Sequence, residues 1–474
     1  MTSRHLRFPS EWKESFRPGA LLFLLLLVSF APLFWNSYVY HNDLGFWIEH
    51  SGSGYYESGH LFLIRRPLGA VLLNLQTAIA QLFPSLLLLL AFRLFTLILV
   101  VCLGMMVNRL LEQHTGLPRL HRAAFVAAVL LQPSWLLTVM WTTNLIPGAV
   151  AYLAGLGGAI ALERVWARSP KLISRGMAMP ALLIAASVLI YPPGALTFFW
   201  LPLIKVCFGT NTFRFRRFVR ETVFFAAVSI VALTVDEVLI RPLACLGNTC
   251  QDWIEPGSTS YSLAPASDFV EKLGVLRDSL TTSLMSWANF AFDPLASSYP
   301  GIAATIFLLL LTAVISIRQK KRNGTPVIVT SVVILAILTG LNAANLVAKF
   351  SVVAFRTVSP DTILIGLILM VVLDSVRSIR VRKAIIGICL AGCAVAAFGT
   401  AHHFTRYYSS GWHKLTSVTA AKNGCVLDPA GRTLQPEPEL SLFFQPQQSA
   451  AALHDFAYEL FLPWTLWARC KVNN

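Results

Sequence analysis

The chain has 474 residues, of which 55% are hydrophobic and only 13% are charged, and its formal net charge is +15. About one quarter of the residues of an ordinary soluble domain are charged, so this composition excludes a soluble globular protein. Apolar runs recur along nearly the whole length, and about 20 apolar residues in a helix span a hydrocarbon core of about 30 Å. The sequence therefore predicts an all-α polytopic integral membrane protein.

The first apolar run begins near Gly19, after a basic segment that superficially resembles the start of a signal peptide. The run ends in the bulky residues Phe34, Trp35 and Tyr38, whereas a cleavage site needs small side chains. We therefore expect this segment to be retained in the protein as the first span.

Placing the basic loops on one side of the membrane predicts about eleven transmembrane helices. Their expected ranges are 19–39, 85–107, 123–141, 145–162, 177–191, 194–208, 221–240, 301–317, 325–341, 362–374 and 384–400. The apolar stretch 67–82 is interpreted as a helix that lies along, or dips into, the outer surface, because a further span would invert every later loop. Its polar residues Asn74, Gln76 and Gln81 suit an interface better than lipid.

The positive charge follows a pattern along the chain. The six segments assigned to the cytoplasm contain 23 Lys and Arg, and they are 1–18, 108–122, 163–176, 209–221, 318–324 and 375–383. The four assigned outside contain only 13 in more than twice the length, and they are 36–68, 241–300, 342–361 and 401–474. This is the positive-inside pattern, which predicts a cytoplasmic N-terminus and an external C-terminus. The charge therefore needs no nucleic-acid partner.

This topology divides the chain into a transmembrane domain, residues 1–400, and an extracytoplasmic C-terminal region, residues 401–474. Four cysteines fall in segments that charge alone places outside, on the oxidising side, and they are Cys245, Cys250, Cys425 and Cys470. Of their three possible pairings, Cys245 with Cys250 and Cys425 with Cys470 is the most local. The other four cysteines lie within the expected spans and are interpreted as packing residues.

The first outer loop concentrates polar and ionisable side chains directly after the first span. Asp43 lies about four residues beyond that span, which is about 6 Å at helical rise and near the level of a lipid phosphate. The loop also contains Asn42, Glu49, His50, Glu57, His60, Arg65 and Arg66. We therefore expect function to reside on the outer side. Short cytoplasmic loops without a phosphate-binding glycine-rich motif argue against an ATP-driven transporter.

The order of these features resembles the membrane-embedded GT-C glycosyltransferases, whose first outer loop has a catalytic carboxylate after the first span, then surface helices, then the second span. More narrowly, HNDLGFW followed by IRRPLGAVLLNL resembles the bacterial O-antigen glucosyltransferases that modify lipopolysaccharide. In those proteins an acidic pair precedes a Gly-Arg-aromatic or Gly-Arg-Pro turn. Here the pair is Asn42-Asp43, and Arg65 stands in the place of the glycine. The resemblance covers about the first 110 residues and the pattern of spans.

The resemblance implies a hexosyltransferase of the bacterial inner membrane that moves a sugar from a polyprenyl-phosphate donor to a cell-surface glycan. Asp43 would act as general base, with inversion at the anomeric carbon, and Glu49 and Glu57 are its rivals. Arginine matches phosphate with a two-pronged fork, so the candidates for holding the donor phosphate are Arg65, Arg66, Lys349 and Arg356. The alternative role of these cations is interfacial anchoring.

No cofactor is firmly implied, although a carboxylate-bound Mg²⁺ or Mn²⁺ stays open. His50 and His60 are ten residues apart, without the spacing of zinc ligands. Two other functions stay open as well. One is a transporter or flippase of lipid-linked glycans, and the other is an O-antigen polymerase or ligase, which depends less on a carboxylate after the first span.

Ionisable residues near the ends of the later spans are expected to form local pairs. Glu237, next to Asp236, is four residues before Arg241, and Asp374 is three residues before Arg377.

Two further motifs mark helix ends. Ser359-Pro360-Asp361 predicts the start of a helix, with Ser359 as its N-cap. The positive end of the helix dipole would be directed at the proposed site. Tyr191-Pro192-Pro193-Gly194 predicts a tight outer turn. Its aromatic ring either lines a lipid groove or anchors at the membrane interface, and we expect the anchor.

Overall fold

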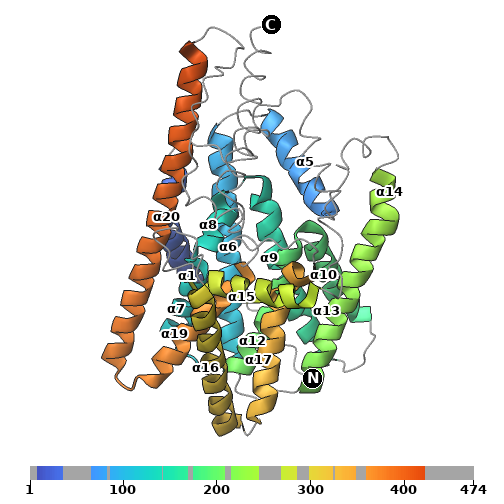
Figure 1. Ribbon diagram of the computed structural model, residues 1–474, viewed down its shortest axis with the longest axis vertical. Coiled ribbons are helices and arrows are strands. Elements are labelled where there is room, and N and C mark those ends of the chain that lie inside the picture. The colour runs from blue at the N-terminus through green and yellow to red at the C-terminus, as the bar shows by residue number, and fades with distance from the viewer. Residues whose placement is uncertain are drawn as a thin grey trace.

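The computed structural model describes residues 8–35, 66–82, 86–140, 142–168, 175–208, 215–244, 268–285, 298–323, 326–347 and 359–421. Within these ranges the chain forms helices joined by turns, without a β-strand (Figure 1). The expected all-α fold is therefore confirmed for the described part of the chain.

The helices of the first half are α1 (Phe8–Ser29), α2 (Pro32–Trp35), α5 (Pro67–Leu82), α6 (Leu86–His114), α7 (Arg119–Leu130), α8 (Pro133–Met140), α9 (Thr142–Arg168), η1 (Arg175–Met177), α10 (Ala178–Ile190), α11 (Pro192–Ala195), η2 (Leu196–Phe199) and α12 (Trp200–Phe208). Those of the second half are α13 (Phe215–Val235), the π-helical turn η3 (Asp236–Ile240), α14 (Arg241–Ala244), α15 (Phe269–Met285), α16 (Ser298–Asn323), α17 (Val327–Leu341), α18 (Ala343–Val347), η7 (Ser359–Thr362), α19 (Ile363–Ser375) and α20 (Ile379–Ala421).

Proline interrupts apolar runs that were expected to be continuous. The run 123–141 is divided into α7 and α8, which are bent by 67° at the break before Pro133. The run 19–39 is similarly divided before Pro32. Proline lacks an N–H group and its ring clashes with the carbonyl four residues earlier, so a helix ends before it and a new one begins with it.

Several helices extend beyond the expected spans because hydropathy marks the apolar part of a helix and not its ends. α16 occupies Ser298–Asn323 where 301–317 was expected, and α20 occupies Ile379–Ala421 where 384–400 was expected. Consequently, the boundary at residue 400 between the two expected regions lies inside α20.

The helix expected at 67–82 is present as α5, but one reason for placing it at the interface is wrong. Asn74 is exposed, whereas the side chain of Gln76 is only 3% exposed. α5 packs against α9 and α10, and the Cα of Gly69 allows the close approach, since a Cβ there would lie 2.7 Å from the carbonyl oxygen of Ile190. Gln76 is therefore a packing residue on the buried face of α5.

α9 is the central helix, because it contacts α5, α6, α8, α10, α11 and α12. Small residues make these contacts close. A Cβ on Gly155 would lie 2.7 Å from the Thr197 hydroxyl oxygen and 2.8 Å from the Gly194 carbonyl oxygen, and a Cβ on Gly194 would lie 2.7 Å from the Cβ of Ala151. Small residues allow helix backbones to approach closely in membrane proteins, where no hydrophobic effect drives helices together.

Four described helices are long and apolar enough to cross a membrane: Leu90–His114, Ile146–Arg168, Phe215–Ile240 and Ile379–His402. The bent pair of α7 and α8 would be a fifth. Shorter apolar helices of 10–17 residues occur at Pro18–Ser29, Pro67–Gln76, Ala178–Ile190, Pro192–Phe208 and Val327–Leu341. The described helices thus form an all-α membrane protein, while length alone marks fewer spans than the eleven expected.

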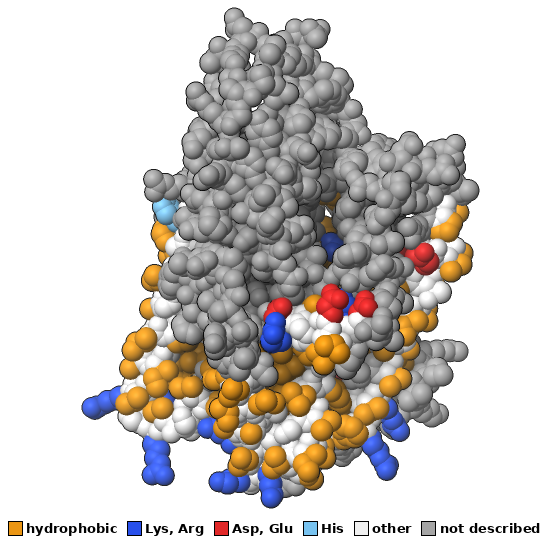
Figure 2. All heavy atoms as spheres, in the orientation of Figure 1, with side chains coloured by type: hydrophobic (Ala, Val, Ile, Leu, Met, Phe, Trp, Pro, Cys, Tyr) orange, Lys and Arg blue, Asp and Glu red, His pale blue; other side chains and the backbone are white. Residues whose placement is uncertain are grey.

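The outer surface of the helices is apolar. Large hydrophobic side chains are exposed along several of them, for example Leu21 at 68%, Ile230 at 64% and Ile388 at 73%. Figure 2 shows hydrophobic side chains spread over a broad region of this face, above the Lys and Arg side chains that project from the lower end. A soluble monomer rarely exposes so large an apolar surface, whereas lipid covers it in a membrane.

The basic segments come together at this lower end, which we call the basic end. Glu163 of α9 forms ion pairs with Lys205 of α12 and Arg217 of α13, and its carboxylate lies 3.2 Å from Nε2 of His114 of α6. Gln319 of α16 donates a 2.8 Å hydrogen bond to the Cys207 carbonyl of α12. These contacts involve residues of four of the six segments that charge alone assigned to one side, namely 108–122, 163–176, 209–221 and 318–324. A further contact joins α16 to the end of α19, directly before the segment 375–383.

That further contact corrects an expected pairing. A carboxylate oxygen of Asp374 lies 3.6 Å from an Arg318 nitrogen of α16, and Arg318 also donates to the Val371 carbonyl at 3.2 Å. The acidic group near the end of α19 therefore pairs with another helix and not with Arg377 on its own chain segment.

Candidate functional site

Most of the candidate residues from the sequence lie outside the described residues. These are Asp43, Asn42, Glu49, His50, Glu57, His60, Arg65, Lys349 and Arg356, together with Cys245, Cys250, Cys425 and Cys470. The side chain of Arg241, the expected partner of Glu237, is also outside them. Arg66 is the candidate that the structure does describe, and the site is built outward from it.

Arg66 immediately precedes α5, and its guanidinium carbon lies 4.8 Å from the centroid of the Tyr191 ring. A guanidinium over the face of an aromatic ring is attracted by the negative face of the ring. The contact brings the end of the first outer loop to the α10–α11 turn. This turn is opposite the basic end, because α10 begins and α12 ends at basic segments.

Tyr191 does not act as the expected anchor at the membrane surface. Its side chain is only 5% exposed, and its ring makes an edge contact with Tyr152 of α9 at a centroid distance of 6.1 Å. Tyr152 in turn contacts Trp135 of α8 at 4.8 Å, and Trp135 contacts Trp200 of α12 at 6.1 Å. Four aromatic rings, from α8, α9, α12 and the turn between α10 and α11, thus form a continuous buried layer.

The aromatic layer holds the turn η7 that begins α19. The indole N–H of Trp135 donates to the hydroxyl of Thr362 at 3.1 Å, and the indole N–H of Trp200 donates to the carbonyl of Pro360 at 2.7 Å. The hydroxyl of Tyr152 forms side-chain hydrogen bonds with Ser359 and Thr138. Buried Trp and Tyr usually satisfy their polar atoms in this way.

The sequence correctly predicted that a helix begins at this motif, but the capping is different. Ser359–Thr362 is a 3-10 turn, in which the Thr362 hydroxyl donates to the Ser359 carbonyl at 2.7 Å. The N-cap residue of α19 is Thr362, without a side-chain capping bond. The side chains of Ser359 and Asp361 are therefore directed into the interior of the protein.

Asp361 is completely buried. Its Oδ1 accepts a 3.1 Å hydrogen bond from the amide Nδ2 of Asn342, at the end of α17, and Oδ2 has no hydrogen-bond partner among the described residues. Burial raises the pKa of this carboxyl from 3.8 to about 8, while the Asn342 hydrogen bond lowers it. Desolvation disfavours the charged form, so Asp361 is mostly protonated at neutral pH.

We call these six residues the aromatic–carboxyl cluster: Trp135, Tyr152, Tyr191, Trp200, Asn342 and Asp361. They come from segments 133–140, 142–168, 190–200, 341–343 and 359–362, and they gather at the end opposite the basic end. All six residues are at most 5% exposed, so the cluster is a packed support and not a binding surface. The partly exposed Arg66 guanidinium lies at its edge.

A second arginine lies at the other end of the first outer loop. Arg93 of α6 is only 1% exposed, and it donates to the Leu33 carbonyl of α2 at 3.1 Å. Leu33 shortly precedes the loop that contains Asp43, and Arg66 lies near the end of that loop. Arginines therefore hold the chain on both sides of the loop.

Sequence reasoning missed the cluster and Arg93. Arg93 carried a visible signal, since it is the one charged residue in the apolar run 86–108. The partnership of Asn342 with Asp361 had no such signal, because the two residues are 19 positions apart and meet only through the packing of α17 on η7. No group of three metal-ligating side chains occurs within the described ranges.

No protein-family model, curated protein or solved structure matches the chain.

Proposed function

We propose that this protein is a membrane-embedded, GT-C-like glycosyltransferase with about eleven spans. It would take a sugar from a polyprenyl-phosphate donor on the outer face of a bacterial inner membrane and add it to a cell-surface glycan, such as the O-antigen of lipopolysaccharide. The basic end would face the cytoplasm and the aromatic–carboxyl cluster the periplasm.

One observation carries this proposal. The loop that contains Asp43 begins beside Arg93 and ends at Arg66, which stacks on Tyr191 at the edge of the aromatic–carboxyl cluster. Arginine binds phosphate through two parallel hydrogen bonds, so Arg66, near the end of a loop with a carboxylate, suits a phosphate-linked donor. The buried Arg93 fixes the chain just before that loop. The apolar helix surfaces beside this end suit its polyprenyl chain.

In the proposed reaction, Asp43 accepts the proton of an acceptor hydroxyl as its oxygen attacks the anomeric carbon. The bond from that carbon to the phosphate oxygen breaks, and the electron pair leaves with the polyprenyl phosphate. A phosphate is a stable anion, so its departure needs no general acid. The attack inverts the anomeric configuration, and the arginines hold the departing phosphate.

The test is transfer of labelled sugar from a panel of polyprenyl-phosphate donors by the purified full-length protein. We expect Asp43→Asn to lower the rate by about 100-fold or more, since general-base catalysis contributes roughly 10²- to 10⁴-fold. Glu49→Gln and Glu57→Gln are the matched controls and should retain activity. Arg66→Gln should raise the KM for the donor.

The outcomes separate the parts of the proposal. If Asp43→Asn is as active as the native protein while Glu49→Gln or Glu57→Gln is inactive, the base is assigned to the wrong carboxylate. If the native protein consumes no donor in the whole panel, the transferase proposal fails.

The buried Asp361 favours a second candidate, a proton-coupled transporter or flippase of lipid-linked glycans. Ionisable groups buried among membrane helices frequently relay protons. In that case Asp361→Asn would abolish transport of a lipid-linked glycan into the opposite leaflet of a proteoliposome, whereas the transferase proposal predicts only a stability effect for this variant.

A further inference from the structure

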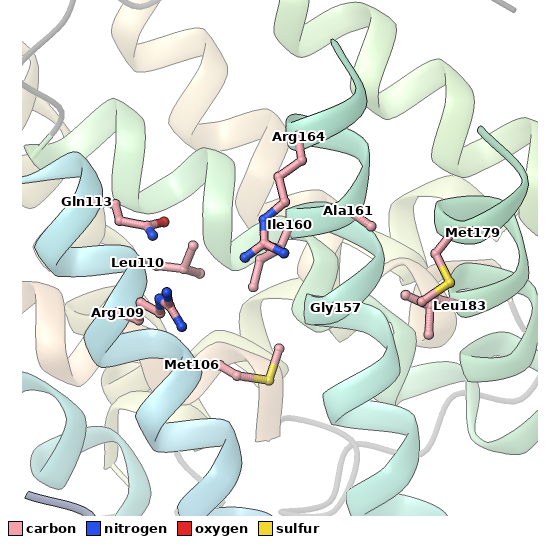
Figure 3. A pocket seen from close by; sticks show the side chains of 10 residues that line it. All are labelled: Met106, Arg109, Leu110, Gln113, Gly157, Ile160, Ala161, Arg164, Met179 and Leu183. Atoms are coloured by element: carbon pink, nitrogen blue, oxygen red, sulfur yellow. The ribbon is translucent and has the colours of Figure 1, made fainter. Parts of the chain in front are cut away.

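A pocket lies at the basic end, opposite the end that holds the aromatic–carboxyl cluster. It has a volume of about 270 Å³ and is formed between α6, α9 and α10. Figure 3 shows the guanidinium groups of Arg109 and Arg164 entering it from α6 and α9, with Met106, Ile160 and Leu183 around its apolar floor. Gln113 lies at its rim, one helical turn beyond Arg109.

The two arginines have no ion-pair partner among the described residues, because the nearby acids are engaged elsewhere. Glu112 forms a 2.9 Å ion pair with Arg122, and Glu163 is bound by His114 at 3.2 Å and by Lys205. Two like charges beside an apolar wall attract an anion, and a guanidinium matches the oxygen atoms of a phosphate. The charge of the pocket therefore calls for an anionic ligand.

The apolar surface beside the pocket indicates what else the ligand contains. On α6 the side chains of Phe95 and Ile98 are 48% and 47% exposed, on the helix face that leads to Arg109. On α10, Met179 of the pocket lining is 61% exposed, and Leu182 on the same helix is 67% exposed. The eleven residues from Ile98 to Arg109 rise by about 16 Å, which is close to half of a hydrocarbon core of about 30 Å.

We propose that this pocket binds the headgroup of an anionic phospholipid. Arg109 and Arg164 hold the phosphate, Gln113 donates to it from the rim, and the acyl chains lie along the exposed faces of α6 and α10. Basic pockets between membrane helices bind anionic lipids by the same combination of charge and apolar surface. This inference does not depend on the proposed transferase activity.

Gly157 offers a way to block the pocket without changing its charge. A Cβ at this position would lie 3.7 Å from a Leu183 methyl carbon and 4.0 Å from the Met106 methyl carbon, which are ordinary contact distances. A leucine at position 157 would extend past these contacts into the pocket. Gly157→Leu should therefore exclude the headgroup while both arginines remain.

The test uses full-length protein in nanodiscs of phosphatidylcholine with or without 20 mol% phosphatidylglycerol, with bound lipid counted by native mass spectrometry. We expect the native protein to retain phosphatidylglycerol selectively. The double variant Arg109→Gln/Arg164→Gln should lose this selectivity by about tenfold or more, equivalent to about 1.4 kcal/mol. Arg168→Gln, on the same helix but outside the pocket lining, is the matched control and should bind as the native protein does.

Three results would overturn the inference. The first is equal phosphatidylglycerol retention by the native protein and the double variant. The second is undiminished retention by Gly157→Leu, which decides the question even if the double variant does not fold. The third is displacement of the retained lipid by millimolar inorganic phosphate as effectively as by added phosphatidylglycerol, which would show that the pocket binds a free phosphate.

Discussion

The carboxyl group of Asp361 is buried between α17 and α19, and its pKa is raised to about 8 by the loss of water. In the unfolded chain the same group ionises near its ordinary pKa of 3.8. The folded protein therefore binds a proton that the unfolded chain releases between these two values. The contribution of the Asp361 carboxyl to the free energy of unfolding is fully present below pH 3.8 and is lost progressively as the pH rises to about 8.

We predict that Asp361→Asn removes this part of the pH dependence. The stability of the variant relative to the native protein should increase between pH 5 and pH 9, because an amide stays neutral throughout. Thermal unfolding in detergent, followed by tryptophan fluorescence, measures the difference, since Trp135 and Trp200 hold the same turn. Asp374→Asn, at a carboxyl that is 45% exposed, is the control. Parallel pH profiles for the native protein and Asp361→Asn would contradict the assignment.

For individual residues, the sequence indicated which polar side chains lie near the end of a span, but it did not indicate which residues they contact. Tyr191 and Gln76 were both expected at a membrane surface and are both buried, because neighbouring helices cover them. Asp374 has a partner on α16, which is more than 50 positions away in the chain. Side-chain partners depend on how helices pack, and a periodic pattern in one segment does not contain that information.

Among the helices, the contact of α9 with the α11–η2 segment depends on Gly155. The nearest atoms to a methyl group placed there belong to the backbone and to a fixed hydroxyl, at 2.7 Å to 2.9 Å. Such contacts cannot be relieved by the rotation of a flexible side chain. The Thr197 hydroxyl is fixed because it donates to the Tyr152 and Gly194 carbonyls at 2.8 Å.

We predict that Gly155→Ala destabilises the protein by about 1–3 kcal/mol, the usual cost of overpacking. Gly148→Ala, on the same helix, should be neutral or stabilising by up to about 1 kcal/mol, because a Cβ there meets nothing within 4 Å and alanine favours the helix. Unfolding of both variants in the same detergent provides the comparison. Equal stability of the two variants would show that α9 does not depend on this close approach.

Helix positions were the most predictable part of the fold. The expected ranges 177–191 and 362–374 agree closely with α10 and α19, because an apolar run between charged or proline-containing segments has clear limits. The breaks before Pro32 and Pro133 could have been predicted from the prolines themselves. The extension of α20 could not, since a helix continues into water when its polar residues permit it.

For the whole molecule, the number of helices that cross the membrane depends on helix length as well as on hydropathy. At 1.5 Å per residue, the 13 residues of α10 and of α19 span only about 20 Å, which is less than a hydrocarbon core of about 30 Å. Hydropathy counts apolar runs, whereas crossing also requires length. The distribution of Lys and Arg provides independent information about which loops share one side of the membrane, because basic segments that alternate along the chain meet at one end of the helices.

We predict that an epitope inserted after Gly116, in the turn between α6 and α7, is accessible only in inside-out vesicles. The same epitope inserted after Ser258, in the segment expected outside, should be accessible in intact spheroplasts. The reason is that basic loops resist translocation. Antibody labelling of both preparations measures the topology, and accessibility of both sites from the same side would contradict an arrangement in which they lie on opposite sides.

The length of α20 determines where the chain beyond it begins. Its 43 residues extend for about 65 Å as a continuous helix, and Figure 1 shows it rising above the other described helices. After a hydrocarbon core of about 30 Å, roughly half of the helix remains beyond the membrane. In the proposed topology, the end of α20 at Ala421 would therefore stand about 30 Å outside the hydrocarbon core, at the height of surface polymers and beyond the lipid headgroups.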